Sequence, residues 1–207
     1  MEPQDIEALF TRADGTYLCA RWGRPIAPVV FGVDDATLSV FKGAIEAVVT
    51  LAGHAMAETD VELGANLMVF FCRDWAELTE VPHLDRLVPD LGPLVARLQA
   101  AEANQYRIFR FDDGGAIKAA FVFLRMDAHL AEVPADTLAL SQAVQTILLW
   151  SDRAFRDTAP LAVVEGVAML RPGIATVIRA ASDPVMPAVS HDASHALRLA
   201  ARLRRDS

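Results

Sequence analysis

The chain of 207 residues lacks the short motifs that mark several large enzyme classes. It contains no Gly-x-Ser-x-Gly, no Gly-x-x-x-x-Gly-Lys and no Gly-x-Gly-x-x-Gly. These motifs form the nucleophile elbow of α/β-hydrolases, the P-loop and the dinucleotide-binding turn. Their absence argues against these three kinds of site.

Cysteines and long apolar runs are scarce as well. Cys19 and Cys72 form no Cys-x-x-Cys pair, so we expect buried free thiols, and the sequence leaves a single bridge between them open. Charged or polar residues interrupt the apolar stretches 44–56 and 116–124, which excludes a membrane span of ~18–20 residues. The acidic N-terminus has no apolar signal segment, so the sequence predicts a cytoplasmic protein unless a signal or lipobox was removed.

Positive charge is in deficit. Lys and Arg number 19 against 27 Asp and Glu, giving a net charge of −8. An acidic chain is a poor partner for nucleic acid, whose phosphates need a cationic surface. The apolar fraction is 53% and the mean hydropathy is +0.28. Such an excess predicts a large core or a self-association surface, and thus a homodimer or a protein partner.

Apolar patterning predicts the first elements. Alternating or continuous apolar residues at 16–22 and 26–33 favour two early strands. Asp34 is a good N-cap for a helix with a period of 3.6 that ends at Gly53. The apolar run 66–72 has the length of a strand and predicts burial on both faces of a sheet.

A hairpin is the clearest later signal. The segments 106–111 and 116–126 flank an Asp-Asp-Gly-Gly turn at 112–115. Beyond Pro134 the chain is predicted to be helical to its end, with breaks at prolines.

This order of elements predicts an α+β fold, in which a mixed sheet with helices is closed by a C-terminal helical layer. No repeat or linker divides the chain, so 1–207 is predicted to be a single domain. Its sheet-rich part spans about 16–126 and its helical part about 134–205.

Two histidines form the most compact candidate site. His191 and His195 lie four residues apart, and Ser190 as N-cap predicts a helix over 191–204. On a helix this spacing places both imidazoles on one face, as in the His-Glu-x-x-His motif of zinc peptidases. Here Asp192 stands where that motif has Glu.

Three features weaken this zinc hypothesis. Arg198 and Arg202 fall on the same predicted helix face and would repel a dication. Asp192 has a shorter reach than the Glu that serves as general base. A catalytic zinc also needs a third protein ligand, which would have to come from a distant residue such as Asp60 or His54.

A second candidate lies on the predicted helix over 136–151. Gln142 and Gln145 are neutral polar residues in an otherwise apolar segment that ends near Trp150. A buried amide needs hydrogen-bond partners, so Gln142 is either a structural crosslink or part of a binding pocket.

Short segments at 21–26, 65–70, 138–144, 151–152 and 181–187, together with an apolar strand that ends at Gly32 and a helix that closes on 51–53, carry a resemblance to a known family. They include a Trp-x-x-Pro strand, an Asn-apolar strand and a Ser-Asp pair. Together they resemble a bacterial domain-of-unknown-function family, many of whose members are described as lipoproteins. The helix of that family is similar to the active-site helix of zinc peptidases, so the resemblance implies a zincin-like fold.

The chain departs from this family pattern at its polar positions. Leu138 and Ala139 stand where the family has paired acidic residues, and neither can bind a metal or transfer a proton. Of the polar residues in the family pattern, this chain keeps Gln142 and Asp152. The resemblance, which covers about 16–205, therefore implies a degenerate member without a hydrolytic site.

The sequence favours a non-catalytic interaction or structural domain that uses no cofactor. Two alternatives stay open. One is a metal-dependent hydrolase that uses His191 and His195. The other is a small-ligand-binding module with a pocket lined by Gln142, Gln145 and Trp150.

Overall fold

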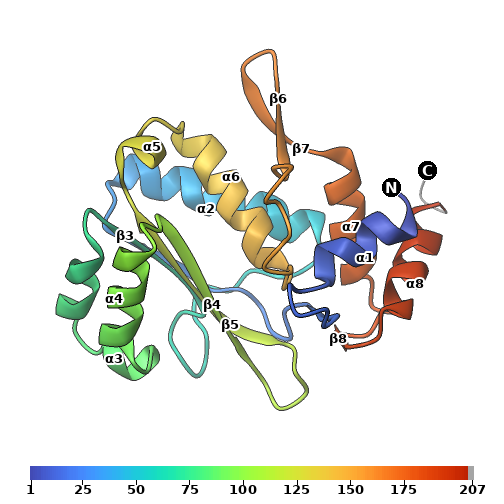
Figure 1. Cartoon of the computed structure of the whole chain (residues 1–207), viewed down its shortest axis with the longest axis horizontal. Coiled ribbons are helices and arrows are strands. Elements are labelled where there is room, and N and C mark those ends of the chain that lie inside the picture. Colours follow the sequence, from blue (N-terminus) through green and yellow to red (C-terminus); the bar gives the residue numbers. More distant parts are fainter. Residues whose placement is uncertain (205–207) are drawn as a thin grey trace.

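A four-stranded sheet forms the centre of the structure, a computed structural model that describes residues 1–204 (Figure 1). The strand order is β2-β3-β5-β4. The strands are β2 (Pro28–Phe31), β3 (Leu67–Cys72), β4 (Gln105–Phe111) and β5 (Ile117–Arg125). The strands β2, β3 and β5 run parallel, and β4 pairs antiparallel with β5 at one edge.

Helices cover both faces of this sheet. On one face lie α2 (Asp35–Leu51) and α6 (Ala135–Ile147), which pack against each other. The other face carries the 3-10 helix η1 (Trp75–Glu80) with α3 (Leu84–Leu87) and α4 (Leu91–Ala100). The short helix α5 (Ala128–Ala131) connects β5 to α6.

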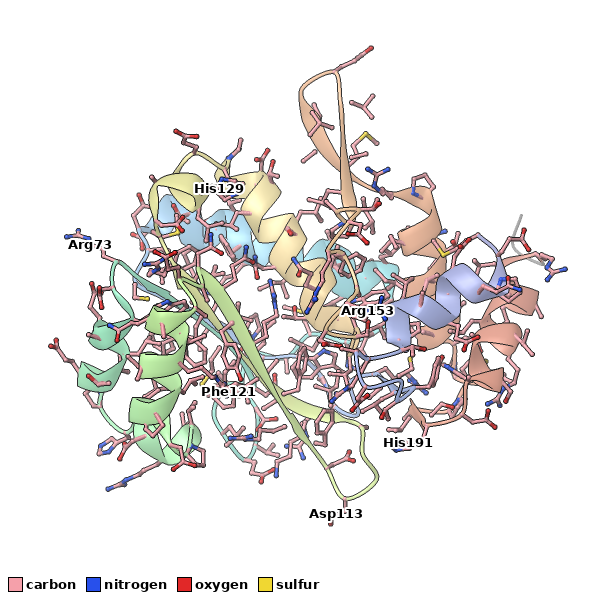
Figure 2. The ribbon with its side chains drawn as sticks, in the orientation of Figure 1. Arg73, Asp113, Phe121, His129, Arg153 and His191 are labelled. Atoms are coloured by element: carbon pink, nitrogen blue, oxygen red, sulfur yellow. The ribbon has the colours of Figure 1, made fainter. Side chains whose placement is uncertain are left out.

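Side chains alternate between the two faces of the central strands, so the hydrophobic core has two parts. Leu67 and Val69 of β3 pack with α2 and α6, whereas Met68 and Phe70 belong to the cluster under α4. Phe121 of β5 lies in that second cluster, between the sheet and α4 (Figure 2). Burial on both faces explains why these strands read as continuous apolar runs, and it confirms the prediction for 66–72.

The C-terminal segment returns to the N-terminus. Helix α8 (Ser194–Leu203) packs against both α1 (Pro3–Phe10) and α7 (Pro172–Ser182) (Figure 1). The two-residue strands β1 (Cys19–Ala20) and β8 (Val189–Ser190) pair antiparallel beside these helices. These helices close the fold at one end of the sheet.

One prediction for this region is wrong, because the chain beyond Pro134 is not helical throughout. Strands β6 (Leu161–Val164) and β7 (Val167–Leu170) form a hairpin that projects from the molecule (Figure 1). Its two turn residues, Glu165 and Gly166, have φ values of 51° and 81°. Positive φ at both central residues is typical of a tight hairpin turn, and the flanking valines favour strands.

The α+β fold class agrees with the sequence prediction, as do helix α2 and the hairpin β4–β5. The side chain of Asp34 caps α2 by accepting a hydrogen bond of 2.8 Å from the backbone N–H of Thr37. The two early strands are shorter than predicted, because only Cys19–Ala20 and Pro28–Phe31 pair as strands. The single-domain assignment stays a prediction, and its last residues, 205–207, lie outside the described ones.

Both cysteines are free and buried, so no bridge joins Cys19 to Cys72. Burial raises the pKa of the Cys19 thiol to about 12 and that of Cys72 to about 11. Both thiols are therefore protonated at neutral pH. Within residues 1–204, no helix has the length and apolarity needed to cross a membrane.

A buried asparagine ties the start of β3 to the segment before β2. The side chain of Asn66, which is fully buried, accepts a hydrogen bond of 2.8 Å from Ala27 N–H. Its amide group donates to the carbonyl of Pro25 at 2.9 Å and to Asp60 Oδ2 at 3.1 Å. These bonds align the two parallel strands at their N-terminal ends.

We predict that Asn66→Ala lowers the free energy of unfolding by about 3 kcal/mol, because buried polar partners lose their hydrogen bonds. Urea denaturation followed by circular dichroism measures this loss. The matched control is Gln4→Ala, an exposed amide on α1, which should change stability by less than about 0.5 kcal/mol. Equal effects of the two substitutions would contradict the role of Asn66.

Candidate functional site

A pocket of about 350 Å³ lies between the edge strand β4 and the segment that follows α6. Its aromatic walls are Phe109, Phe111, Trp150 and Phe155, and it also holds Arg107 and Gln145. A volume of this size falls within the range of small-molecule sites. We call it the Arg107 pocket.

The alternation of strand β4 builds one wall of this pocket. Arg107, Phe109 and Phe111 occupy every second position, and the first two share a sheet face because side chains alternate along a strand. This face looks toward α6, since the cross-strand partners of Arg107 and Phe109 are Val122 and Ala120 of the α2–α6 core. The register shifts between Arg110 and Phe111, which keeps Phe111 opposite Ile117 on the same side.

Two neutral amides hold the guanidinium of Arg107. Its Nη2 donates to Gln142 Oε1 at 2.5 Å and to Gln105 Oε1 at 3.0 Å. Gln142 Nε2 in turn donates to Gln105 Oε1 at 2.9 Å. This triangle joins β4 to α6 and orients the guanidinium at the pocket.

The charge of Arg107 has no acidic partner within residues 1–204. Its Nε is buried and makes no hydrogen bond there. Desolvation lowers the pKa of Arg107 to about 10, so the side chain still carries its positive charge at neutral pH. A desolvated charge without a counter-ion is costly, and it favours an anion in the pocket.

Aromatic packing fixes the opposite wall. Trp150 Nε1 donates to the carbonyl of Val144 at 2.8 Å, and its ring stacks on Phe10 at a centroid distance of 5.2 Å. Phe155 meets Trp150 edge-on at 5.0 Å. The backbone of Phe155 has a φ of 65°, a left-handed conformation that costs free energy in a bulky residue.

The remaining polar groups lie around this aromatic frame. Gln145 Nε2 donates to Ser141 Oγ at 2.9 Å, which leaves its carbonyl oxygen without a protein partner in the described chain. Asp152 accepts a hydrogen bond of 2.9 Å from Ala13 N–H and lies 3.9 Å from Arg156. Asp152 therefore anchors the chain that follows α6.

Two of the three residues proposed from sequence line this pocket, namely Gln145 and Trp150. Gln142 is buried behind the pocket, where it holds Arg107, so it is a positioning residue. Arg107, Phe109 and Phe111 are not among the site residues predicted from the sequence. Their spacing of two residues could have identified them, since it places an arginine on the same strand face as phenylalanine.

The structure separates the two histidines. Helix α8 begins at Ser194 rather than after Ser190, so His191 precedes it and lies exposed on the outside of the molecule (Figure 2). His195 is 1% exposed, and its Nδ1 shares a hydrogen bond of 2.8 Å with the Tyr17 hydroxyl. The expectation that both imidazoles lie on one helix face with Arg198 and Arg202 is therefore wrong.

The suggested third ligands have other partners. Asp60 accepts from Arg24 at 3.3 Å, and Nε2 of His54 lies 2.8 Å from the carbonyl oxygen of Arg24. Across residues 1–204, no group of three or more His, Cys, Asp or Glu side chains is placed to hold a metal ion. His191 and His195 are not brought together with either suggested ligand.

Comparisons with protein-family models, with curated proteins and with solved structures find no match to this chain. The resemblance to the lipoprotein family thus stays a prediction.

The buried histidine predicts a pH dependence of stability. Desolvation lowers the pKa of His195 from 6.5 to about 4, so between these pH values the unfolded chain binds a proton that the folded chain does not. The stabilisation is complete above pH 6.5 and is lost as the pH falls toward 4. Between pH 7 and pH 4 we expect the wild type to lose about 2–3 kcal/mol more unfolding free energy than His195→Gln.

Urea titrations at several pH values measure this difference. His191→Gln is the matched control, because His191 is exposed, and it should keep the slope of the wild type. If His195→Gln also kept that slope, the buried, neutral state of His195 would be refuted.

Proposed function

We propose that this protein binds a small organic ligand in the Arg107 pocket and performs no chemistry on it. The observation that carries this proposal is the oriented guanidinium of Arg107 inside an aromatic pocket of about 350 Å³. Pockets that combine apolar walls with a few placed polar groups are typical of ligand sites. The binding module predicted around Gln142 is thus the alternative that the geometry favours.

The composition of the pocket supports binding without catalysis. Its ionisable lining residues in the described chain are Arg12, Arg107 and Asp152. Guanidinium groups stay protonated near neutral pH and cannot act as general bases. Ser151 also lines the pocket, but its Oγ contacts the Ala8 carbonyl and backbone N–H groups rather than a base that could activate it.

A cytoplasmic location is part of this proposal. Both cysteines carry free thiols, and free thiols fit the reducing environment of the cytoplasm.

A neutral aromatic probe tests ligand binding. We expect 2-naphthamide to bind at one site and to shift the amide NMR signals of 105–111 and 149–155. Gln145→Trp fills the pocket with a larger side chain and should abolish these shifts. Gln99→Trp places the same change on the exposed side of α4 and should preserve them. Shifts that persist in Gln145→Trp, or a wild type in which neither 2-naphthamide nor 2-naphthoate shifts these signals, would refute the proposed pocket.

The projecting hairpin favours a second role, which is self-association. On one face of β6–β7, Val164, Val167 and Met169 are each more than half exposed. Exposed apolar side chains gathered in this way mark interaction sites. Within residues 1–204, β6 and β7 pair only with each other, so each offers a free backbone edge.

A second copy of this chain is the occupant that we propose for the hairpin. Glu165 is the single charged residue between Leu161 and Leu170, in a chain whose net charge is −8. Two copies that associate through this hairpin bring few like charges together, whereas association through more acidic faces would be opposed by charge repulsion. A two-fold axis would pair equivalent strands antiparallel, as in many homodimers.

Sedimentation velocity at about 50 µM tests this association. We expect a dimer for the wild type and a monomer for Val167→Lys, because the charge would be buried without a partner. Val61→Lys is the control, since Val61 is fully exposed far from the hairpin in sequence, and it should remain dimeric. A monomeric wild type, or a dimeric Val167→Lys, would refute self-association through this hairpin.

A further inference from the structure

The charge balance of the Arg107 pocket indicates what kind of ligand it holds. Its described lining contains two arginines, Arg12 and Arg107, and one carboxylate, Asp152. Neither arginine has an acidic side chain within ion-pair distance among residues 1–204. Two positive charges and one negative charge give the described lining a net charge of +1, in a chain whose net charge is −8.

The unused hydrogen-bond donors lie on the same guanidinium. Nη2 of Arg107 satisfies both of its N–H groups with Gln105 and Gln142. Nε and Nη1 make no hydrogen bond within residues 1–204. Because the side-chain amides of Gln105 and Gln142 are neutral, they orient the guanidinium without cancelling its charge.

The side chains of the pocket walls indicate the shape and polarity of the rest of the ligand. Phe109 and Phe111 lie on β4, and Trp150 and Phe155 lie on the chain after α6. The Trp150 indole N–H is already bonded to Val144, so this ring offers an apolar surface. These four rings favour a flat, apolar body rather than a polar one.

We infer that the Arg107 pocket recognises a small monocarboxylate with an aromatic or flat apolar body. This inference rests on the proposed ligand-binding function and adds the chemical class. The carboxylate accepts hydrogen bonds from Arg107, and the apolar body lies between the phenylalanines of β4 and Trp150. The negative charge of Asp152 disfavours a second carboxylate on the ligand.

A matched pair of ligands tests the inference by calorimetry and NMR. 2-Naphthoate and 2-naphthamide have the same shape and differ in charge. We expect the carboxylate to bind at least about tenfold more tightly, because hydrogen bonds between two charged groups are stronger than those to a neutral acceptor. Equal affinities would overturn the carboxylate assignment while leaving the binding function intact. Failure of both ligands to shift the pocket signals would refute the binding function itself.

Variants on the two faces of β4 test whether Arg107 causes the preference for the carboxylate. Arg107→Met keeps an unbranched side chain and should reduce naphthoate affinity to that of naphthamide, which should itself change little. Arg110→Met is the control, because Arg110 donates to the Leu87 carbonyl on the other side of the sheet, and it should leave both affinities unchanged. If Arg107→Met does not fold, the comparison of the two ligands on the wild type still tests the carboxylate assignment.

Inorganic phosphate distinguishes a carboxylate site from a general anion site. Phosphate has no apolar body to pack against the aromatic walls, so 10 mM phosphate should not displace 2-naphthoate. Displacement that requires Arg107 would show that the site accepts any small anion, and it would overturn the assignment to carboxylates.

Discussion

The register of β4 against β5 is the constraint on which the candidate site depends. It places Arg107 opposite Val122 and Phe109 opposite Ala120, on the face that meets α6. A slip of one residue would turn the neighbouring side chains, including Ile108 and Arg110, toward α6 instead. The register shift after Arg110 then brings Phe111 to the same side as Arg107, so a local irregularity of the strand completes the aromatic wall.

The hydrogen-bonded triangle of Gln105, Arg107 and Gln142 connects this register to the helix layer. It brings a cation into a desolvated position where no acidic side chain among residues 1–204 pairs with it. A protein that needed this contact only for stability could use apolar residues of similar size at lower cost. This cost is the reason for proposing an anionic ligand, and Phe155, whose left-handed backbone also costs free energy, lines the same pocket.

The pocket and the hairpin β6–β7 involve different parts of the molecule and suggest complementary roles. One is concave, aromatic and positively charged, whereas the other is projecting, apolar and nearly uncharged. Segment 151–160 lies between them in the chain, and Ala154 and Phe155 line both the Arg107 pocket and a wider hollow of about 840 Å³ that reaches Ala162 of β6. The proposed ligand pocket is thus connected to the base of the proposed association surface through shared lining residues.

The sequence by itself determined the local elements whose signals are short in range. The cap at Asp34, the turn before β5 and the two-sided burial of β3 follow from neighbouring residues and from period. It also indicated that Gln142 needs partners, and it grouped Gln145 with Trp150, which line the same pocket. Only the tertiary structure decided that those partners are Gln105 and Arg107, some 35 residues away, and that His191 and His195 are separated. Such contacts depend on strand register and on where a helix begins, and neither is encoded by spacing along the chain.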